Sequence, residues 1–219
     1  MPLYTNTYPV LNTFTSTYEQ FATGEDYYVT GLQQAMYNNL PARLGIASNG
    51  STWQCFGRTF RNALMVNDRV DGYAPFAYNA DKYLAGNGLS NQAGIYPSQG
   101  YVVSFFGEGG ARRKESGFDV VPYELIFFID TSVVTPPFAI TPLIRIDEYL
   151  IDVVKNFVNL NGNGLHLRGT ERDMDKVLEK YSGVTKRMNL IKNLQPFVCF
   201  KLNIELIYNS YLQPVRLVA

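Results

Sequence analysis

The sequence predicts a single α+β domain in which helices pack on an antiparallel sheet that includes a long β-hairpin. Three patterns favour this fold class: helical periodicity near the N-terminus, an apolar hairpin in the middle, and an alternating strand near the C-terminus. With 219 residues, 46% hydrophobic and 17% charged, the chain is long enough to bury one substantial core. We expect an extended N-terminal arm at residues 1–24, one domain at 25–219, and a loop-rich insertion at 71–98.

The arm is expected to be irregular because residues 1–24 are rich in Tyr, Thr and Asn, carry little charge and show no sustained periodicity. A helix then follows from about Glu25 to Leu40, with apolar residues at intervals of three and four, namely Tyr28, Leu32, Ala35, Met36 and Leu40. Acidic residues at its start suit the positive end of the helix dipole. Pro41 and Gly45 are expected to end it.

The next part of the chain is the least regular. Residues 53–66 contain apolar residues without a clean period. Residues 71–98 are rich in Gly, Asn, Ala and Pro. This composition predicts mostly loop, with short strands at best.

A long hairpin is predicted in the middle of the chain. Residues 101–106 and 120–129 are β-like, and the connection at residues 107–117 is rich in glycine and charge. Both faces of the returning strand are apolar, so we expect this strand to be central and covered on both sides.

A second helix is predicted after a proline-rich connection, with Thr141 as its cap and Pro142 in its first turn. Its apolar face comprises Ile146, Tyr149, Leu150, Val153, Phe157 and Leu160, and its polar face comprises Arg145, Asp147, Glu148, Asp152, Lys155 and Asn156. The run Asn-Gly-Asn-Gly at residues 161–164 is expected to end it.

Two further elements complete the predicted fold. Residues 170–173 form an acidic variant of a capping box, and the helix that follows directs Met174, Val177, Leu178 and Tyr181 inward. In the last strand Val198, Phe200, Leu202, Ile204, Leu206 and Tyr208 alternate with Cys199, Lys201, Asn203 and Glu205. This alternation predicts an antiparallel strand with one buried and one wet face.

Composition narrows the class of protein. Nineteen basic and nineteen acidic residues cancel, so no overall field attracts nucleic acid or an anionic membrane. No apolar run approaches the roughly 18 residues of a membrane span, and the start lacks a signal-peptide pattern. We expect a soluble protein with no membrane partner. Sixteen Tyr and fourteen Phe suit either a protein interface or a tyrosine-rich β core.

Groups with catalytic or metal-binding chemistry are few. The one histidine, His166, has no cysteine or carboxylate at ligand spacing, and Cys55 and Cys199 are far apart between apolar neighbours, as expected of reduced, packed thiols. The glycines of residues 107–110 lack the ending of a phosphate-binding loop. The acidic residues 147, 148 and 152 fit a solvated helix face better than an acid–base cluster. We expect no catalytic residues, cofactor or metal, and no enzyme.

The order of elements resembles the tail terminators and related neck proteins of tailed bacteriophages. The features that carry the resemblance are the N-terminal helix, Trp53 followed by Gly57 and Arg58, the hairpin with its aromatic strand at 123–130, a helix, and the closing strand at 200–209. The aromatic, Asn-rich N-terminal segment is similar in texture to virion proteins of crAss-like phages. The arm and residues 71–98 exceed the minimal family pattern and would be additions.

The resemblance implies a structural virion protein, a ring-forming subunit of the head-to-tail connector or tail terminator, assembled in the host bacterial cytoplasm. Its partners would be copies of itself, neighbouring portal, neck or tail proteins and, transiently, DNA in the lumen. The interface candidates are Tyr4, Tyr8, Phe14, Tyr18 and Phe21 in the arm, and Arg112, Arg113 and Lys114 at the hairpin tip. The arm residues would equally suit a segment folded back on its own domain, and the basic tip a solvated turn.

Other functions remain open on the sequence alone. A small enzyme or ligand-binding α+β domain, whose site no local motif exposes, is the alternative from a different class. A β-rich adaptor of another bacterial assembly would share every sequence feature described above but would not belong to a virion.

Overall fold

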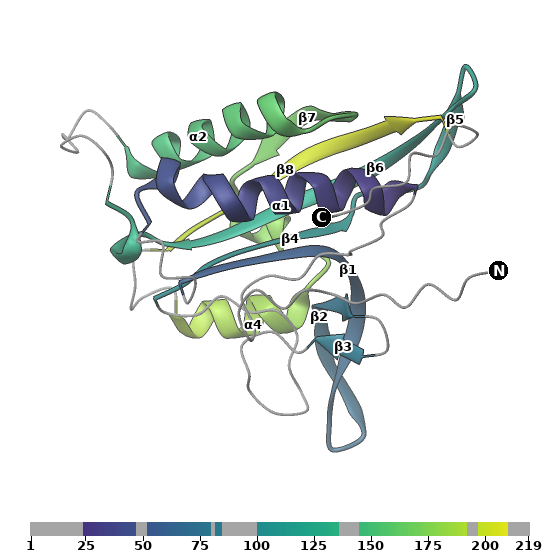
Figure 1. Ribbon diagram of the computed structural model, residues 1–219. Coiled ribbons are helices and arrows are strands. Elements are labelled where there is room, and N and C mark those ends of the chain that lie inside the picture. The colour runs from purple at the N-terminus through teal and green to yellow at the C-terminus, as the bar shows by residue number, and fades with distance from the viewer. Residues whose placement is uncertain are drawn as a thin grey trace.

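One sheet of eight strands organises the part of the chain that the structure, a computed structural model, describes: residues 24–46, 52–79, 82–84, 100–135, 145–191 and 197–209 (Figure 1). The strand order is β3-β2-β1-β4-β6-β8-β7, with β5 beside β6. All neighbours are antiparallel except β1 and β4. The α+β class and the mostly antiparallel sheet are therefore confirmed.

The elements follow one another along the chain as α1 (Glu25–Leu44), β1 (Trp53–Val66), β2 (Arg69–Asn79), β3 (Lys82–Leu84), β4 (Val102–Glu108), β5 (Arg113–Glu115), β6 (Phe118–Asp130), a 3-10 turn (Thr131–Val133), α2 (Ile146–Asn161), β7 (Leu165–Glu171), α3 (Met174–Val177), α4 (Ser182–Ile191) and β8 (Phe197–Tyr208).

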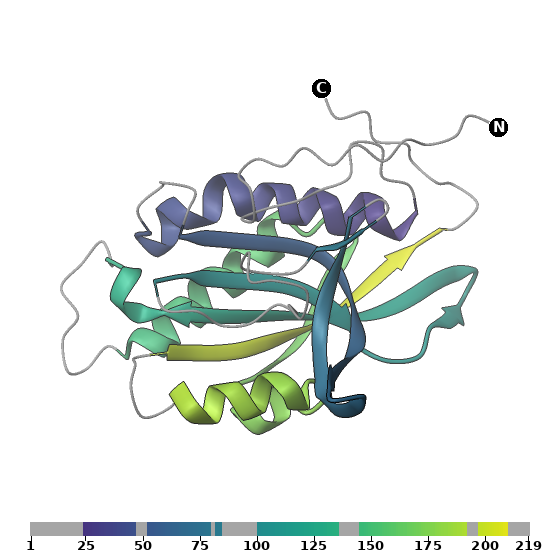
Figure 2. The same ribbon diagram turned by 90° about the horizontal axis from the view of Figure 1, so that it is seen from below.

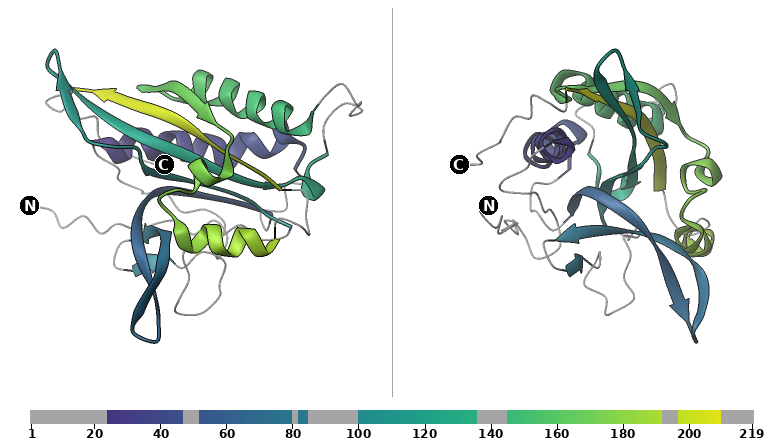
Figure 3. Two further views of the ribbon diagram at one scale, coloured as in Figure 1. Left: turned by 180° about the vertical axis from the view of Figure 1, so that it is seen from behind. Right: turned by 90° about the vertical axis from the view of Figure 1, so that its right-hand side faces the viewer.

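The sheet is covered on both faces, which gives three layers. Helices α1 and α2 lie on one face, and α3 and α4 lie on the other (Figures 2 and 3). Two apolar cores result: Phe127 and Phe200 stack between the sheet and α1–α2, while Phe105 packs against Tyr181 on the α4 side. Strand β6 lies between β4 and β8, and residues 123–130 are buried, as the two apolar faces predicted.

Helix α1 continues past the proline that was expected to stop it. Pro41 lies in its last turn, and the helix ends at Gly45, which has a φ of 70°. A proline removes one hydrogen bond of the helix, but Leu44 beyond it is fully buried in the core. Packing therefore carries the last turn, and only the glycine was the correct stop signal.

Strands β1 and β2 form a long ribbon. Mostly loop was predicted for residues 71–98, so that prediction is wrong for residues 71–79, which belong to β2. The two strands pair from Thr59 with Ala77 to Val66 with Arg69, around a turn at Asn67 and Asp68. Both turn residues have positive φ, 48° and 60°, as the tight turns of twisted hairpins require. The remainder of the predicted insertion, residues 85–98, lies outside the described residues.

Helix α2 differs from its prediction at its start and along its buried face. It begins at Ile146, with Arg145 as the preceding residue, so Thr141 is not its cap. Its buried residues are Leu150, Ile151, Val154, Phe157 and Val158. Leu160 is 74% exposed, because contact with both α1 and the sheet rotates the buried stripe toward Ile151 and Val158. The glycine-rich end after Asn161 is confirmed.

The segment between α2 and β8 was predicted as a connection and one helix, but it begins with an edge strand. Thr170 belongs to β7 and pairs with Leu202, so it caps nothing. Asp173 caps α3 by accepting a hydrogen bond from the Asp175 N–H at 3.1 Å. The inward direction of Val177, Leu178 and Tyr181 is confirmed. Helix α4, which was not predicted from the sequence, completes the second cover layer.

Candidate functional site

A partly buried charge cluster, centred on Glu25, ties the start of α1 to the neighbouring strands. Glu25 is only 7% exposed, accepts a hydrogen bond from the Tyr123 hydroxyl and forms an ion pair with Arg112. Arg58 on β1 donates to Asp26 at 2.8 Å and lies 3.8 Å from Glu25. Burial raises the pKa of Tyr123, and its hydrogen bond to Glu25 raises it further, while Arg58 opposes this. The cluster fixes α1 against β1 and the β4–β6 hairpin.

A second buried cluster lies on the opposite face, under α3. Lys201 donates to Glu124 Oε1 at 3.0 Å, and both side chains are at least nine-tenths buried. Lys180 approaches the same oxygen at 3.1 Å and donates to the Glu108 carbonyl at 2.7 Å. Burial raises the pKa of Tyr181, and the nearby Glu124 carboxylate adds to the effect.

This second cluster corrects the predicted wet face of β8. Lys201 was assigned to water, yet it is 6% exposed because α3 covers it and its ammonium also donates to the Lys176 carbonyl at 3.0 Å. Asn203, on the same face, is exposed as predicted. Glu124 and Glu179, whose carboxylate lies 3.6 Å from the Lys201 ammonium, together balance the two lysines, which suits a structural role.

The basic tip of the β4–β6 hairpin folds onto acidic residues of its own chain. Arg112 pairs with Glu25, Arg113 donates to Glu115 and to Glu205, and Lys114 lies 3.9 Å from Asp119. The tip was predicted either to meet acidic groups or phosphates of a partner or to be a solvated turn. Much of its charge is balanced within the chain.

Glu205 on β8 is the centre of this surface network. It accepts from Arg113 and from Arg168, both at 2.6 Å. The hydrogen bonds from Arg113 and Arg168 hold the pKa of Glu205 below its usual value, against the opposing effect of burial. Strand β7, strand β8 and the hairpin tip are thus joined by one carboxylate.

The histidine and the two cysteines lie apart from one another in the fold. His166 is exposed on β7 opposite Glu205. Cys55 faces the α1 side, where burial raises its pKa to about 12 despite a hydrogen bond from Ser104. Cys199 packs on the other side of the sheet, and burial raises its pKa as well. Among the described residues no group of three or more His, Cys, Asp or Glu side chains is arranged to hold a metal ion.

The acidic residues of α2 lie on its solvent-facing side. Asp147 pairs with Arg145 at 2.8 Å, and Asp152 lies 3.8 Å from Lys155. Glu148 is exposed and lies 3.7 Å from Arg172, which directly follows β7. The arm candidates fall outside the described residues: these are Tyr4, Tyr8, Phe14, Tyr18 and Phe21.

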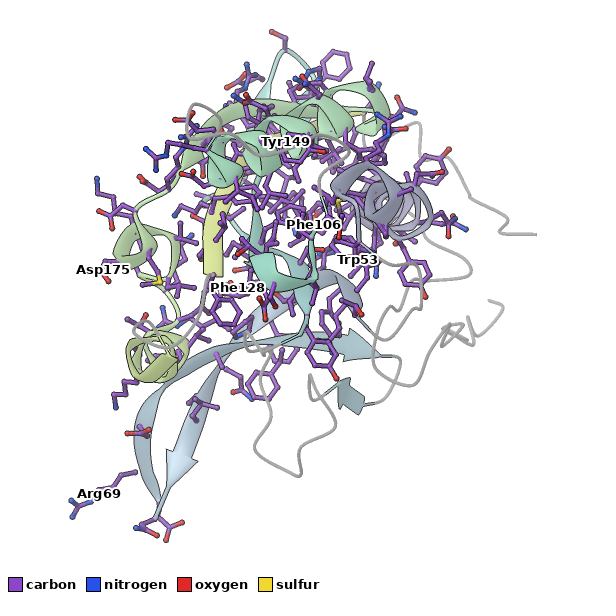
Figure 4. The ribbon with its side chains drawn as sticks, turned by 90° about the vertical axis from the view of Figure 1, so that its left-hand side faces the viewer. Trp53, Arg69, Phe106, Phe128, Tyr149 and Asp175 are labelled. Atoms are coloured by element: carbon purple, nitrogen blue, oxygen red, sulfur yellow. The ribbon has the colours of Figure 1, made fainter. Side chains whose placement is uncertain are left out.

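Two hairpins project from the three-layer body, and each carries an exposed apolar side chain near its turn. The β1–β2 ribbon extends to one side, with Arg69 at its far end, and the β5–β6 hairpin extends in another direction (Figures 1, 3 and 4). Val70 is 55% exposed beside the first turn, and Phe118 is 45% exposed beside the second. These two residues were not predicted as site candidates, because their exposure depends on where the hairpins leave the sheet.

The base of the β1–β2 ribbon is held by the start of α4. A Cβ on Gly72 would lie 2.7 Å from the backbone nitrogen of Gly183, so the backbones of β2 and α4 are in contact at these two glycines. Ser182 Oγ accepts from the Tyr73 N–H at 3.3 Å, and Lys186 reaches Asp71 Oδ1 at 2.7 Å. The ribbon therefore leaves the body in a defined direction.

No family model matches the chain, and neither the curated proteins nor the solved structures contain a significant match to it. None of the helices in the described ranges is long and apolar enough to cross a membrane.

Proposed function

We propose that this protein is a structural subunit that works by packing against copies of itself in a closed ring. The observation that carries the proposal is the pair of projecting hairpins, each with a large apolar side chain exposed near its turn, Val70 on one and Phe118 on the other.

An isolated two-stranded hairpin is marginally stable in water, and hairpin turns are usually polar. Apolar side chains at the ends of two projections gain free energy when a neighbour covers them, about 25 cal/mol per Å² of buried apolar surface. Because the two hairpins point in different directions, each copy can meet neighbours on two sides, as a ring of identical subunits requires.

We further propose that the ring belongs to the head-to-tail connector or tail terminator of a tailed phage, and that it is assembled in the host cytoplasm and retained in the virion. The order of helix, hairpin, helix and closing strand supports this assignment. The partners would then be portal, neck or tail proteins. Transient contact with DNA would depend on basic groups other than Arg112 and Arg113, because these two already pair with carboxylates of their own chain.

Native mass spectrometry tests the assembly. We expect one dominant closed oligomer for the wild-type chain and a shift toward monomer in the double variant Val70→Ser/Phe118→Ser. Lys155→Ser, on the polar face of α2, is the control and should keep the wild-type mass. An unchanged oligomer in the double variant would overturn the role of the hairpin ends.

Electron cryo-microscopy of phage particles that encode this chain tests the location. The proposal expects a ring of this fold between head and tail. Purified particles that lack the chain would refute the virion assignment, even if the isolated protein formed a ring.

A further inference from the structure

Several elements far apart in the sequence meet at the end of the molecule where α1 begins. The Ile207 N–H donates to the Gly164 carbonyl at 3.0 Å, which joins the end of β8 to the loop after α2. The rings of Tyr28 and Tyr208 lie 5.8 Å apart, and Tyr208 is the register partner of Asp119 at the start of β6. We call this region, formed by residues 24–28, 115–120, 157–164 and 206–209, the α1-start end.

Exposed apolar side chains concentrate at the α1-start end. Of the three large apolar residues exposed in the described part of the chain, two lie here: Phe118, 45% exposed, and Leu160, 74% exposed. Leu160 stands in the last turn of α2, and its neighbours Asn159 and Asn161 are also exposed. An exposed leucine is common by itself, but here it shares one end of the molecule with an exposed aromatic residue.

The N-terminal arm joins the described fold at this same end, through Gly24. Its sequence, residues 1–23, contains three Tyr and two Phe and one acidic residue, Glu19, with no lysine or arginine. The five aromatic side chains gain free energy by contact with an apolar surface, and the lack of lysine and arginine means that little charge must leave water. The exposed apolar surface and the start of the aromatic arm are therefore found at the same end of the folded molecule.

The arm is long enough to reach a neighbouring copy. Twenty-three residues span at most about 75 Å when extended, whereas a compact domain of this size has a radius of gyration of about 17 Å. In a ring, the equivalent ends of adjacent subunits are separated by about one subunit diameter. One arm can therefore span that separation.

We propose that the arm of one copy docks on the α1-start end of the next copy, with its aromatic residues covering Phe118 and Leu160. This inference rests on the proposed ring, because a second copy must supply the arm. Each subunit would then donate one arm and receive one, which closes the ring without a special first or last member.

Photo-crosslinking between isotopically distinct chains tests the docking. A ¹⁴N chain with benzoylphenylalanine in place of Phe14 is co-assembled with a ¹⁵N-labelled chain of wild-type sequence, which carries no crosslinker. The assembly is then irradiated and digested. We expect arm peptides of the ¹⁴N chain joined to ¹⁵N peptides that contain residues 115–120 or 157–164. Crosslinks confined to ¹⁴N peptides, or to other surfaces, would overturn the inference.

A receiving-side variant makes the test specific. Leu160→Ser in the ¹⁵N chain should lower the yield of these crosslinks about tenfold, since it removes most of the apolar side chain that the arm covers. Lys155→Ser in the same helix should leave the yield unchanged. If the oligomer forms but the crosslinks lie elsewhere, the docking fails and the ring stands. If no oligomer forms, the ring itself fails.

Discussion

At the scale of single residues, buried charges hold the two faces of the sheet in place. Glu124 and Lys201 are paired at 3.0 Å across β6 and β8. Such a pair adds little stability over apolar residues of similar shape, but removal of one partner leaves an uncompensated buried charge. The loss should therefore be large for a single substitution and small for a matched double substitution.

We predict that Lys201→Met lowers the free energy of unfolding by about 3 kcal/mol, because Glu124 is then left buried with only Lys180 beside it. Urea denaturation measures the change. Glu124→Leu/Lys201→Met should recover much of the loss. Lys155→Met, which breaks a surface pair with Asp152 at 3.8 Å, should change stability by less than about 0.5 kcal/mol. Equal losses in Lys201→Met and Lys155→Met would contradict the account.

A second residue couples stability to pH. Asp130 is 1% exposed and accepts hydrogen bonds from the Gly100 N–H at 2.8 Å and from the Ser132 N–H and hydroxyl at 2.9 and 2.6 Å. Burial alone would raise the pKa of Asp130, but these hydrogen bonds to the carboxylate outweigh it and hold the pKa below its usual value. The group therefore stabilises the fold above the pKa of an unfolded Asp, about 3.9, and loses that effect as the pH falls through its lower folded pKa.

We predict that Asp130→Asn costs about 1–3 kcal/mol at neutral pH, where the charged hydrogen bonds are complete. The difference from wild type should shrink as the pH falls below about 4, because the unfolded chain then takes up a proton that the folded carboxylate does not bind until the pH reaches its lower folded pKa. Urea titrations from pH 7 to pH 2 give both curves. A difference that stays constant over this range would refute the assignment.

The residue scale also shows where sequence reasoning reached its limit. The basic tip at Arg112 and Arg113 follows from glycine and charge in the sequence, but its partners do not. Arg113 and Glu205 are 92 residues apart and meet only because β5 and β8 both pair with β6. The positive charge of Arg113, for which the sequence indicates no partner, is thus balanced by a carboxylate that the fold brings close.

At the scale of elements, α4 controls the direction of the β1–β2 ribbon. The contact between Gly72 and Gly183 leaves no room for a side chain, and neither backbone can move away without opening the ribbon or the helix. The contact joins two elements that were both misjudged from the sequence. A paired ribbon with Gly and Pro in its second strand resembles a loop in composition, and α4 is short.

We predict that Gly72→Ala destabilises the protein by about 1–3 kcal/mol, because the new Cβ would lie 2.7 and 2.8 Å from backbone atoms of Gly183. Hydrogen exchange in β2 and α4 should accelerate together. Gly169→Ala, on β7, is the control: its Cβ would meet only the Asn203 Nδ2 at 3.7 Å. If the two variants were equally stable, the ribbon would not depend on this contact.

Long elements with a clear period were predictable, and elements that depend on distant partners were not. The buried strand β6, the alternation of β8 and the helix α1 all follow from local patterns. Strand β7 was hidden because its pairing with β8 is interrupted by a register shift between Leu167 and Gly169, and its outward residues are polar. The buried Lys201 opposite α3 was missed for the same reason, since only the tertiary fold shows what covers it.

At the scale of the whole molecule, a covered three-layer body carries two projecting hairpins, and the α1-start end is the surface on which we propose that the arm of a neighbouring copy docks. The two cores of this body stabilise the fold. Cys55 and Cys199 lie on opposite faces of the sheet. The projections and the exposed apolar residues Val70, Phe118 and Leu160 have no such internal role. The proposed contact with further copies would bury all three side chains.

The most direct test of assembly by packing is single-particle electron cryo-microscopy of the purified, assembled chain. We expect a closed ring with rotational symmetry, in which Val70 and Phe118 lie at the boundaries between subunits and become buried there. Particles that remain monomeric at every concentration and with every candidate neck or tail partner, or rings in which both hairpin ends face solvent, would contradict the account.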